Sequence, residues 1–479
     1  MLRRTKIVAT LGPATDDPKV LDEVICAGVD VVRINLSHGS HAEHMQRAEW
    51  VRNRARASGR QVGLLADLQG PKIRIGKFRE GAVQLAIGDL FTLDAALPLD
   101  AGDPQRVGLT FKQLPSDVSR GDTLLLDDGQ IVLWVNEVAG AEVRCKVVVG
   151  GKLSSSKGLN KQGGGLSAPA LTDKDREDIC FAAEVEADYV AVSFVRSAED
   201  VNEARRLLRE AGGKGGILAK IERAEAVDAI DEIIDASDAI MVARGDLGVE
   251  IGDAELPAVQ KKLIKLARSM NCVVITATQM MQSMIDSPIP TRAEVFDVAN
   301  AVLDGTDAVM LSAETAAGKY PAKVVEAMDR VCREAEKQSE VRRSDHRLHS
   351  VFGRIDEAIA MATMYTANHL GVAAIAALTE SGATPKWMSR ISSGIPIYAL
   401  TPHVATRRKV TLFFGVYPIS FYLRCTDTVR ANREVVEELL RRGAIRNDDL
   451  VIITKGDFDG REGATNVMKI VRVGDQQPD

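Results

Sequence analysis

An ammonium and two carboxylates lie at the ends of two consecutive apolar segments of the sequence. Lys220 and Glu222 close the first segment, and on a β-strand residues two apart point to the same face. Asp246 closes the second segment. Such charges are costly at the mouth of a buried sheet unless a ligand neutralises them. A hard divalent cation held by the carboxylates and by phosphate oxygens would do so, and Lys220 would then be a point charge on a transferring phosphoryl group. The alternative is that all three are ordinary strand ends in solvent.

The elements that must position these residues are short apolar segments alternating with amphipathic segments of helical period. Eight such βα units predict an α/β fold, a (β/α)8 TIM barrel, whose catalytic residues gather at the carboxyl ends of the strands. The predicted strands are Thr5–Thr10, Val29–Leu36, Val62–Leu68, Tyr189–Phe194, Gly216–Ile221, Ala239–Ala243, Cys272–Ala277 and Ala308–Leu311.

The long interval between the third and fourth predicted strands has a different pattern. Apolar β-type runs broken by glycine recur in it, with tight turns such as Asp127–Gly129. The pattern predicts a small all-β lid domain at 71–166, inserted on the barrel face where the active site would lie. Gly163–Gly165 is a predicted hinge at the exit of this insertion.

The remaining segments divide into a barrel and a second α/β domain. The catalytic barrel is predicted to comprise residues 1–70 and 167–339, with a helix running from Pro321 to about Ser339. A polar stretch at 340–349 is a predicted linker. Residues 350–479 then repeat strands and helices with apolar faces of their own, which predicts a smaller C-terminal α/β domain.

Composition excludes several classes of function. The net charge of −6 over 479 residues argues against a nucleic-acid coat, and an aromatic content of 4% argues against stacking platforms for single strands. No apolar run approaches the ~18 residues of a membrane span, and the first residues lead directly into a strand pattern without a secretory signal. The six cysteines form no CxxC pair and indicate reduced thiols. We therefore expect a cytoplasmic protein.

Other predicted strands also end in polar residues. Arg33 follows the second strand and Arg74 the third, and forked guanidinium groups suit phosphate recognition; for Arg33 a structural salt bridge is the alternative. His38 is interpreted as a capping or packing residue. Thr278 ends the seventh strand, where it could carry a proton, hold water or cap a helix.

The chain resembles the pyruvate kinase family from end to end. The longest motif that carries the resemblance is Ile217–Val227, and it is supported by Met241–Glu250, Ala277–Met284, Pro290–Glu294 and Met310–Thr315. The resemblance implies a barrel, a β-barrel lid inserted after the third strand and a C-terminal α/β regulatory domain. It also implies the last step of glycolysis, in which phosphoenolpyruvate and ADP give pyruvate and ATP, and a homotetramer.

The resemblance also implies a role for each matching position. It assigns the phosphoryl group to Arg33 and Lys220, Mg²⁺ or Mn²⁺ to Glu222 and Asp246, the substrate carboxylate to the backbone N–H groups of Gly245 and Asp246, the nucleotide to Asn35, Arg74 and Lys174, and the proton relay to Thr278 and Ser312. This fits phosphoryl transfer, which requires charge neutralisation and alignment rather than a covalent nucleophile.

The monovalent-cation region departs from the pattern of many family members. Those members hold K⁺ with groups at the positions of Asn35, Ser37, Asp67 and the Leu68 carbonyl, and they carry Glu where this chain has Lys72. The sequence here resembles the branch in which an internal lysine replaces the cation, because an ammonium can supply the same positive charge. We therefore expect an enzyme that does not require K⁺; the alternative is that Lys72 points to solvent.

The C-terminal domain contains a polar loop, Leu378–Thr384, before a helix expected to begin near Pro385. Hydroxyls and backbone N–H groups at a helix start can bind an anion, and in the family this loop binds the phosphate of an allosteric effector. The alternative is an ordinary strand-to-helix loop. The branch resemblance implies AMP or a sugar monophosphate. The candidate effector residues are Thr379, Ser381, Thr384 and, from a second loop at 457–465, Arg461.

Two other functions remain as alternatives at this stage. A metabolite sensor that has lost its chemistry would require a broken site, yet Lys220, Glu222, Asp246 and Thr278 are all present. A metal-dependent barrel aldolase could use the same carboxylates with an enolate. The inserted lid and the additional phosphate-binding cations favour phosphoryl transfer, and dependence of turnover on ADP would separate the two.

Overall fold

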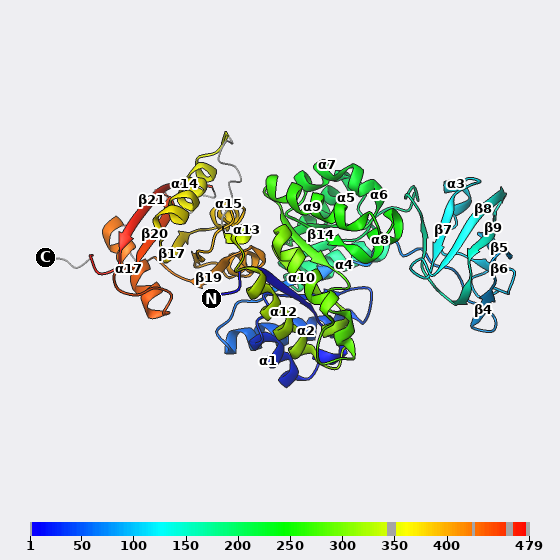
Figure 1. Cartoon of the computed structure of the whole chain (residues 1–479), viewed down its shortest axis with the longest axis horizontal. Helices are drawn as coiled ribbons and strands as arrows, with labels where there is room; N and C mark the ends of the chain where they lie inside the picture. The colour runs from blue at the N-terminus through cyan, green and yellow to red at the C-terminus, as the bar shows by residue number, and fades with distance from the viewer. Residues whose placement is uncertain (1, 343–350, 424–426, 457–462, 476–479) are drawn as a thin grey trace. The chain divides into compact units, whose positions relative to one another are not determined.

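A computed structural model describes residues 2–342, 351–423, 427–456 and 463–475. Its strands form a closed barrel of eight, a two-stranded sheet, a six-stranded sheet and a five-stranded sheet (Figure 1). No helix among these described residues is long and apolar enough to cross a membrane. The predicted fold class, a (β/α)8 barrel with a β-rich insertion and a C-terminal α/β domain, is confirmed.

The eight predicted barrel strands are all present, and none of their ends moves by more than two residues. The parallel register is seen directly where β1 pairs with β2 and β16, and where β13 pairs with β14. In spatial order the strands are β1 (Lys6–Thr10), β16 (Ala308–Leu311), β15 (Val273–Ala277), β14 (Ala239–Ala243), β13 (Gly216–Ile221), β12 (Tyr189–Val192), β3 (Gly63–Asp67) and β2 (Val31–Asn35).

Helices follow the strands and are set by local signals. Ser40 caps α2 because its hydroxyl accepts the Glu43 N–H while the Glu43 carboxylate accepts the Ser40 N–H, a capping box that Thr291 and Glu294 repeat at α10. The helices are α1 (Pro18–Cys26), α2 (His41–Ala57), α4 (Asp173–Glu184), α5 (Ala198–Glu210), α6 (Ala224–Asp228), α7 (Ile230–Ala236), α8 (Arg244–Ile251), α9 (Leu256–Ser269), α10 (Arg292–Asp304), α11 (Ala313–Ala316) and α12 (Pro321–Ala335), with 3-10 turns η1 (Pro13–Thr15) and η2 (Gln282–Ile285).

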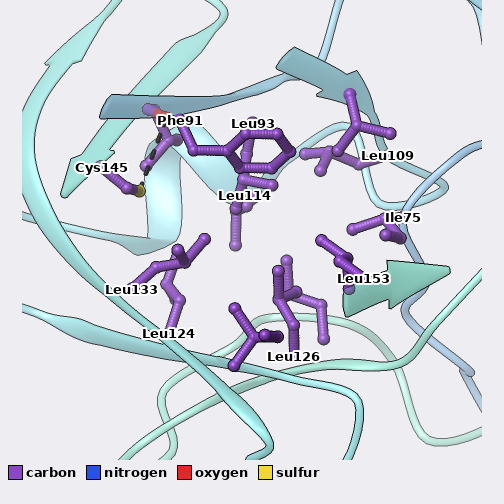
Figure 2. Packing of buried hydrophobic residues seen from close by; sticks show 14 of the residues in the cluster. Ile75, Phe91, Leu93, Leu109, Leu114, Leu124, Leu126, Leu133, Cys145 and Leu153 are labelled. Carbon is purple, nitrogen blue, oxygen red and sulfur yellow. Dashed lines mark hydrogen bonds between the residues drawn. The ribbon is translucent and has the colours of Figure 1, made fainter. Parts of the chain in front are cut away.

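The inserted segment is β-rich and has its own core. Alternate residues of its strands point inward, as in the buried-exposed alternation of β9, and Figure 2 shows Phe91, Leu93, Leu124 and Leu133 converging. The elements are β4 (Ala82–Leu85), β5 (Leu90–Asp94), β6 (Arg106–Gly108), α3 (Leu114–Asp117), β7 (Thr123–Leu126), β8 (Ile131–Ala139), β9 (Glu142–Val149), β10 (Gly151–Ser154) and β11 (Leu159–Lys161).

The C-terminal sheet has the strand order β19-β18-β17-β20-β21. The sequence predicts four of its strands, at Val372–Leu378, Ile397–Leu400, Val416–Ile419 and Leu450–Thr454, but not β21, which pairs antiparallel with β20 at the sheet edge. The elements are α14 (Ile355–Leu370), β17 (Ala374–Leu378), α15 (Ala383–Ser389), β18 (Ile397–Thr401), α16 (Val404–Lys409), η3 (Val410–Leu412), β19 (Val416–Ser420), α17 (Thr428–Arg441), β20 (Leu450–Gly456) and β21 (Thr465–Arg472).

Two sequence expectations at the domain junction need correction. The helix expected to reach about Ser339 ends at Ala335, and a short helix, α13 (Ser339–Arg342), occupies the start of the expected linker. The remainder of that linker, 343–349, lies outside the described residues, so the domain boundaries themselves stay predictions.

By its internal contacts the chain forms two compact units. The first comprises Met1–Ala66, Val185–Tyr189 and Ile264–Asp479, and the second comprises Asp67–Glu184 and Val190–Leu263. The first unit therefore includes the C-terminal sheet, and the second includes the β-rich insertion.

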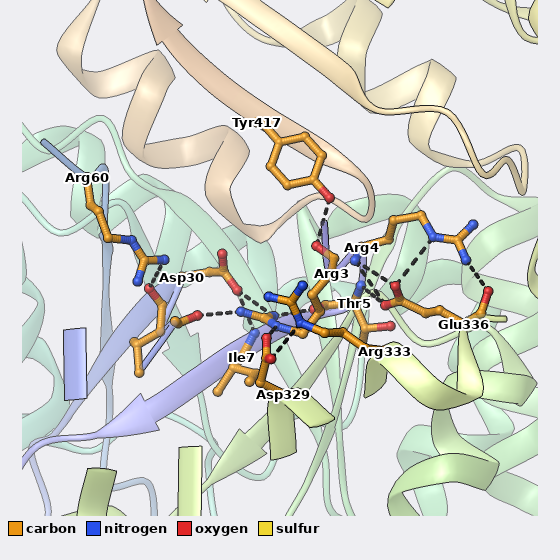
Figure 3. Close-up of polar contacts among 12 residues, drawn as sticks. Arg3, Arg4, Thr5, Ile7, Asp30, Arg60, Asp329, Arg333, Glu336 and Tyr417 are labelled. Carbon is orange, nitrogen blue, oxygen red and sulfur yellow. Dashed lines mark hydrogen bonds and ion pairs between the residues drawn. The ribbon is translucent and has the colours of Figure 1, made fainter. Parts of the chain in front are cut away.

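Within the first unit, the segment before β1 is packed against both a barrel helix and the C-terminal domain. The Glu336 carboxylate, just beyond α12, accepts the backbone N–H groups of Arg4 at 2.9 Å and of Thr5 at 2.7 Å (Figure 3). The Tyr417 hydroxyl on β19 donates to the Arg3 carbonyl at 2.7 Å. Buried Arg390 from the C-terminal domain pairs with Asp307 at the start of β16.

Lys6, the first residue of β1, is enclosed in the same region. Its Nζ donates to the Val416 carbonyl at 2.6 Å and lies 4.4 Å from the centroid of the Tyr417 ring. Burial lowers the pKa of Lys6 to about 8, although nearby Asp30 acts in the opposite direction.

The titration of Lys6 gives a pH-dependent prediction. Between pH 8 and 10.5 the folded chain loses this proton while the unfolded chain keeps it, so the free energy of unfolding rises with pH by up to about 3 kcal/mol. The melting temperature, measured from pH 7 to 10.5, should therefore rise relative to that of Lys6→Met across this window. A difference between the two proteins that stays constant with pH would contradict the assignment.

Candidate active site

Four barrel strands that are neighbours in the order β14-β13-β12-β3 carry polar residues at or just beyond their carboxyl ends. Asp67 is the last residue of β3, Ser193 follows β12, Lys220 lies near the end of β13 and Glu222 follows it. Asp246 was expected to close a strand, but β14 ends at Ala243 and Asp246 lies in the first turn of α8. The expectation failed because the strand passes directly into a helix without a loop.

Lys220 is held among oxygens. Its Nζ lies 2.9 Å from Glu222 Oε1 and 3.3 Å from Asp67 Oδ1, and it donates to Ser193 Oγ at 2.7 Å. The side chains of Asp67 and Glu222 are only 1% and 2% exposed, and that of Lys220 is 12% exposed. These three groups form a buried charge cluster, so the alternative of solvated strand ends does not apply to Lys220 and Glu222.

Asp246 belongs electrostatically to the same cluster. Burial and, after it, the charge of Glu222 raise the pKa of Asp246 to about 6, with Lys220 acting against the rise. Two carboxylates that repel each other in a buried site are a donor set that a divalent cation would relieve. Among the described residues no group of three or more His, Cys, Asp or Glu side chains gathers as a metal cage, so a cation here would need oxygens from its substrate as well.

Lys72 does not stand alone in solvent. It is half-buried, and burial lowers its pKa, with Arg74 and Lys220 acting in the same direction and Asp246 and Asp67 against it. Lys72 is therefore within electrostatic reach of the carboxylates that surround Lys220. Its partial burial favours a place near these carboxylates over the alternative in which Lys72 points to solvent.

The predicted nucleotide contacts in this unit lie on other elements. Arg74 donates from Nη1 to the Ser156 carbonyl at 2.7 Å, at the edge of the β-rich insertion. Lys174 lies in the first turn of α4, half exposed, and pairs with Asp178 at 2.5 Å on the same helix. Gly245 is the second residue of α8.

The remaining predicted catalytic residues belong to the first unit. Buried Arg33 on β2 donates from Nη1 to Thr10 Oγ1 on β1 at 3.0 Å. Thr278 follows β15 with φ +68 and donates to the Ala277 carbonyl at 2.6 Å. It therefore has a left-handed backbone, which is a true outlier for a β-branched residue and does not match the helix-capping alternative. Asn35 accepts the Ser37 N–H through its side chain at 3.2 Å.

Sequence reasoning assigned no role to Glu314. This buried carboxylate follows β16, accepts the Ser312 N–H at 2.6 Å and accepts the Met281 N–H at 3.3 Å, so it fixes the chain at Ser312. An acidic residue a few positions after an apolar strand was the available signal. Ser193 and Phe194, which contact Lys220 and Glu222, were also missed.

The candidate effector loop of the C-terminal domain is partly described. The Thr379 hydroxyl accepts the Gly382 N–H at 2.9 Å, and Thr384 Oγ1 lies 2.6 Å from Thr465 Oγ1 on β21. Ser381 lies half-buried between β17 and α15. The helix begins at Ala383, before the expected position near Pro385. Arg461 lies outside the described residues.

A buried ammonium among carboxylates at the carboxyl ends of barrel strands lies where barrel enzymes carry their catalytic residues. Residues 2–325 match the family model described as pyruvate kinase, barrel domain, and residues 357–471 match the model described as pyruvate kinase, alpha/beta domain. The chain is 57% identical over 476 residues to a protein of Salmonella typhimurium named pyruvate kinase II, a match that covers 98% of this chain and 99% of that one. It is 54% identical over 468 residues to a pyruvate kinase of Haemophilus influenzae, with 97% of each chain covered.

The chain belongs to the pyruvate kinase family. It is a phosphotransferase that transfers the phosphoryl group of phosphoenolpyruvate to ADP, giving pyruvate and ATP in the last step of glycolysis. The metabolite sensor and the barrel aldolase are thereby set aside. The family generally uses a divalent and a monovalent cation.

Proposed function

We propose that the Lys220 cluster is the site of phosphoryl transfer in this enzyme. The observation that carries this proposal is the buried Lys220 ammonium, 2.9 Å from Glu222 and 3.3 Å from Asp67. In the reaction the bond between phosphorus and the enol oxygen breaks, a bond to the ADP oxygen forms, and the enolate takes a proton at carbon. Lys220 would offset the charge on the phosphoryl oxygens, since such catalysis depends on alignment and electrostatics.

Glu222 and Asp246 would hold the divalent cation, Mg²⁺ or Mn²⁺. Burial and the charge of Glu222 raise the pKa of Asp246, because two carboxylates close together repel each other. A cation between them would relieve this repulsion. When bound, the cation acts as a Lewis acid that stabilises the enolate oxygen. The backbone N–H groups of Gly245 and Asp246, in the first turn of α8, would bind the substrate carboxylate.

The remaining predicted residues complete the proposal. Arg33 would contact the phosphoryl group, and Thr278 with Ser312 would relay the proton to the enolate. The left-handed φ of Thr278 supports that role, because strained backbone is concentrated at functional sites. Contacts to the nucleotide are proposed for Asn35, Arg74 and Lys174.

Lys220 gives the central test of this proposal. Lys220→Met keeps the length of the side chain and removes its charge, so kcat should fall by about a thousandfold or more, while the dissociation constant of Mn²⁺, measured by electron paramagnetic resonance, changes little. Lys319→Met is the matched control, because Lys319 is 67% exposed and pairs with an exposed Asp286. Near-normal turnover of Lys220→Met would show that the role is wrongly assigned.

We also propose that Lys72 replaces the monovalent cation. The support is its position within electrostatic reach of Asp246, Asp67 and Lys220. The resemblance assigns K⁺ in other members of the family to the positions of Asn35, Ser37, Asp67 and the Leu68 carbonyl, and those members carry Glu at the position of Lys72.

Turnover in K⁺-free buffer at constant ionic strength tests this role. The unmodified enzyme should be active without K⁺ and should gain little from it. The kcat of Lys72→Met should fall about tenfold, which corresponds to a loss of ~1.4 kcal/mol of transition-state stabilisation. Added K⁺ should restore part of this activity. Lys77→Met, an exposed lysine of the same segment, is the control. An unmodified enzyme that is inactive without K⁺ would end the proposal.

The C-terminal domain would regulate the enzyme by binding AMP or a sugar monophosphate, and the assembly would be a homotetramer in the cytoplasm. The support is the loop of Thr379, Ser381 and Thr384, whose hydroxyls lie beside the start of α15. Arg461 would also contact the phosphate of the effector.

Isothermal titration with AMP and with ribose 5-phosphate separates the two effector classes. One of them should bind and lower the concentration of phosphoenolpyruvate at half-maximal rate. Ser381→Ala should weaken that binding by about tenfold, since a hydrogen bond to a charged phosphate contributes ~1.5–3 kcal/mol, while the rate without effector is unchanged. Absence of heat and of activation with both ligands would contradict the proposal.

A further inference from the structure

We infer that the two-residue turn Ser193–Phe194, which follows β12, is the positioning element of the active site. Ser193 fixes the ammonium of Lys220, and the backbone N–H of Phe194 fixes the carboxylate of Glu222. The inference rests on the proposed functions of Lys220 and Glu222, and it concerns how the protein holds these side chains in place.

The Ser193 hydroxyl has a defined direction. Its oxygen lies 2.8 Å from the Leu68 carbonyl and 2.7 Å from Lys220 Nζ, in a side chain that is only 1% exposed. A carbonyl can only accept, and an ammonium can only donate. The single hydroxyl proton is therefore directed to Leu68, and a lone pair of the oxygen faces Lys220.

The neutral character of Ser193 matters for the charge of the cluster. Asp67 and Glu222 also contact Lys220, but each carboxylate offsets part of the positive potential that a phosphoryl group would meet. A hydroxyl holds the ammonium by a short hydrogen bond without adding negative charge. Ser193 thus restricts the position of Nζ and leaves the potential of Lys220 available to a substrate.

Phe194 acts through its backbone. Its N–H donates to Glu222 Oε2 at 2.8 Å, while the other oxygen of Glu222 faces Lys220 at 2.9 Å. Phe194 has φ +55, a left-handed conformation that is uncommon for a bulky residue. The turn therefore directs an N–H group to one carboxylate oxygen and leaves the second oxygen beside the ammonium.

Gly70 provides the space for this turn. A Cβ at position 70 would lie 2.7 Å from Ser193 Cβ and 2.9 Å from Phe194 Cδ2, and Gly70 itself has φ +66. The ring of Phe194 also faces the Arg223 guanidinium, whose carbon lies 5.5 Å from the ring centroid. The turn is therefore packed against both Gly70 and Arg223.

The test is Ser193→Ala, assayed with Mg²⁺ and saturating ADP. We expect kcat to fall by about 10- to 100-fold, as is usual when a partner that orients an active-site group is removed. The KM for phosphoenolpyruvate, the dissociation constant of Mn²⁺ and the melting temperature should change little. Ser193→Thr, which keeps the hydroxyl, should recover most of the activity, and Ser193→Cys, which keeps the size but bonds weakly, should not. Ser197→Ala, four residues further along, is the matched control.

A double-mutant cycle shows whether Ser193 acts through Lys220. In the Lys220→Met background, Ser193→Ala should lower the residual turnover by less than about twofold. If Ser193→Ala alone keeps kcat within twofold of the unmodified enzyme, or if its Mn²⁺ affinity falls in parallel with kcat, the inference is overturned. Failure of the underlying proposal gives a different result, because Lys220→Met would then itself retain near-normal turnover.

Discussion

The arrangement of the active site depends on the balance of charge around the Lys220 ammonium. The Lys220 ammonium lies beside two nearly inaccessible carboxylates, those of Asp67 and Glu222, and burial together with the charge of Glu222 raises the pKa of nearby Asp246. Removing one member of a buried group of this kind leaves an uncompensated charge. In the proposed function this surplus of carboxylate would favour a cation, and the neutral Ser193 holds the ammonium without increasing that surplus.

The barrel makes such a cluster possible because parallel strands bring their carboxyl ends to one face. Asp67, Lys220 and Glu222 come from β3 and β13, with β12 between them in the strand order. At the opposite, amino end of the barrel, Asp307 precedes β16 and pairs with Arg390 of the C-terminal domain. Both of these charged side chains are buried. The proposed chemistry and the attachment of the C-terminal domain thus use opposite ends of the barrel strands.

The sequence predicted the regular part of this structure well. The barrel strands are continuous apolar runs, and the strands of the β-rich insertion alternate between apolar and polar residues. The pattern of apolar residues was therefore sufficient to locate both. Strand β21 was missed because Thr465–Arg472 lies at a sheet edge with most of its side chains exposed or half-buried, and its apolar pattern is weak. Ser193 and Phe194 could not be recognised from the sequence. Serine is common after strands, and nothing in the residue type of Phe194 indicates its left-handed φ. Lys220 and Glu222 were recognisable because charges ending apolar runs are rare.

The burial of the segment before β1 has a consequence for how the chain is made. Arg3, Arg4 and Thr5 are synthesised more than three hundred residues ahead of two of their partners, Glu336 and Tyr417. At a synthesis rate of ~5–20 residues per second, tens of seconds pass between the synthesis of this segment and the synthesis of these two partners. The first barrel strand therefore cannot reach its final surroundings early in synthesis. The packing of the segment before β1 against Glu336 and Tyr417 is a late step in the folding of the chain.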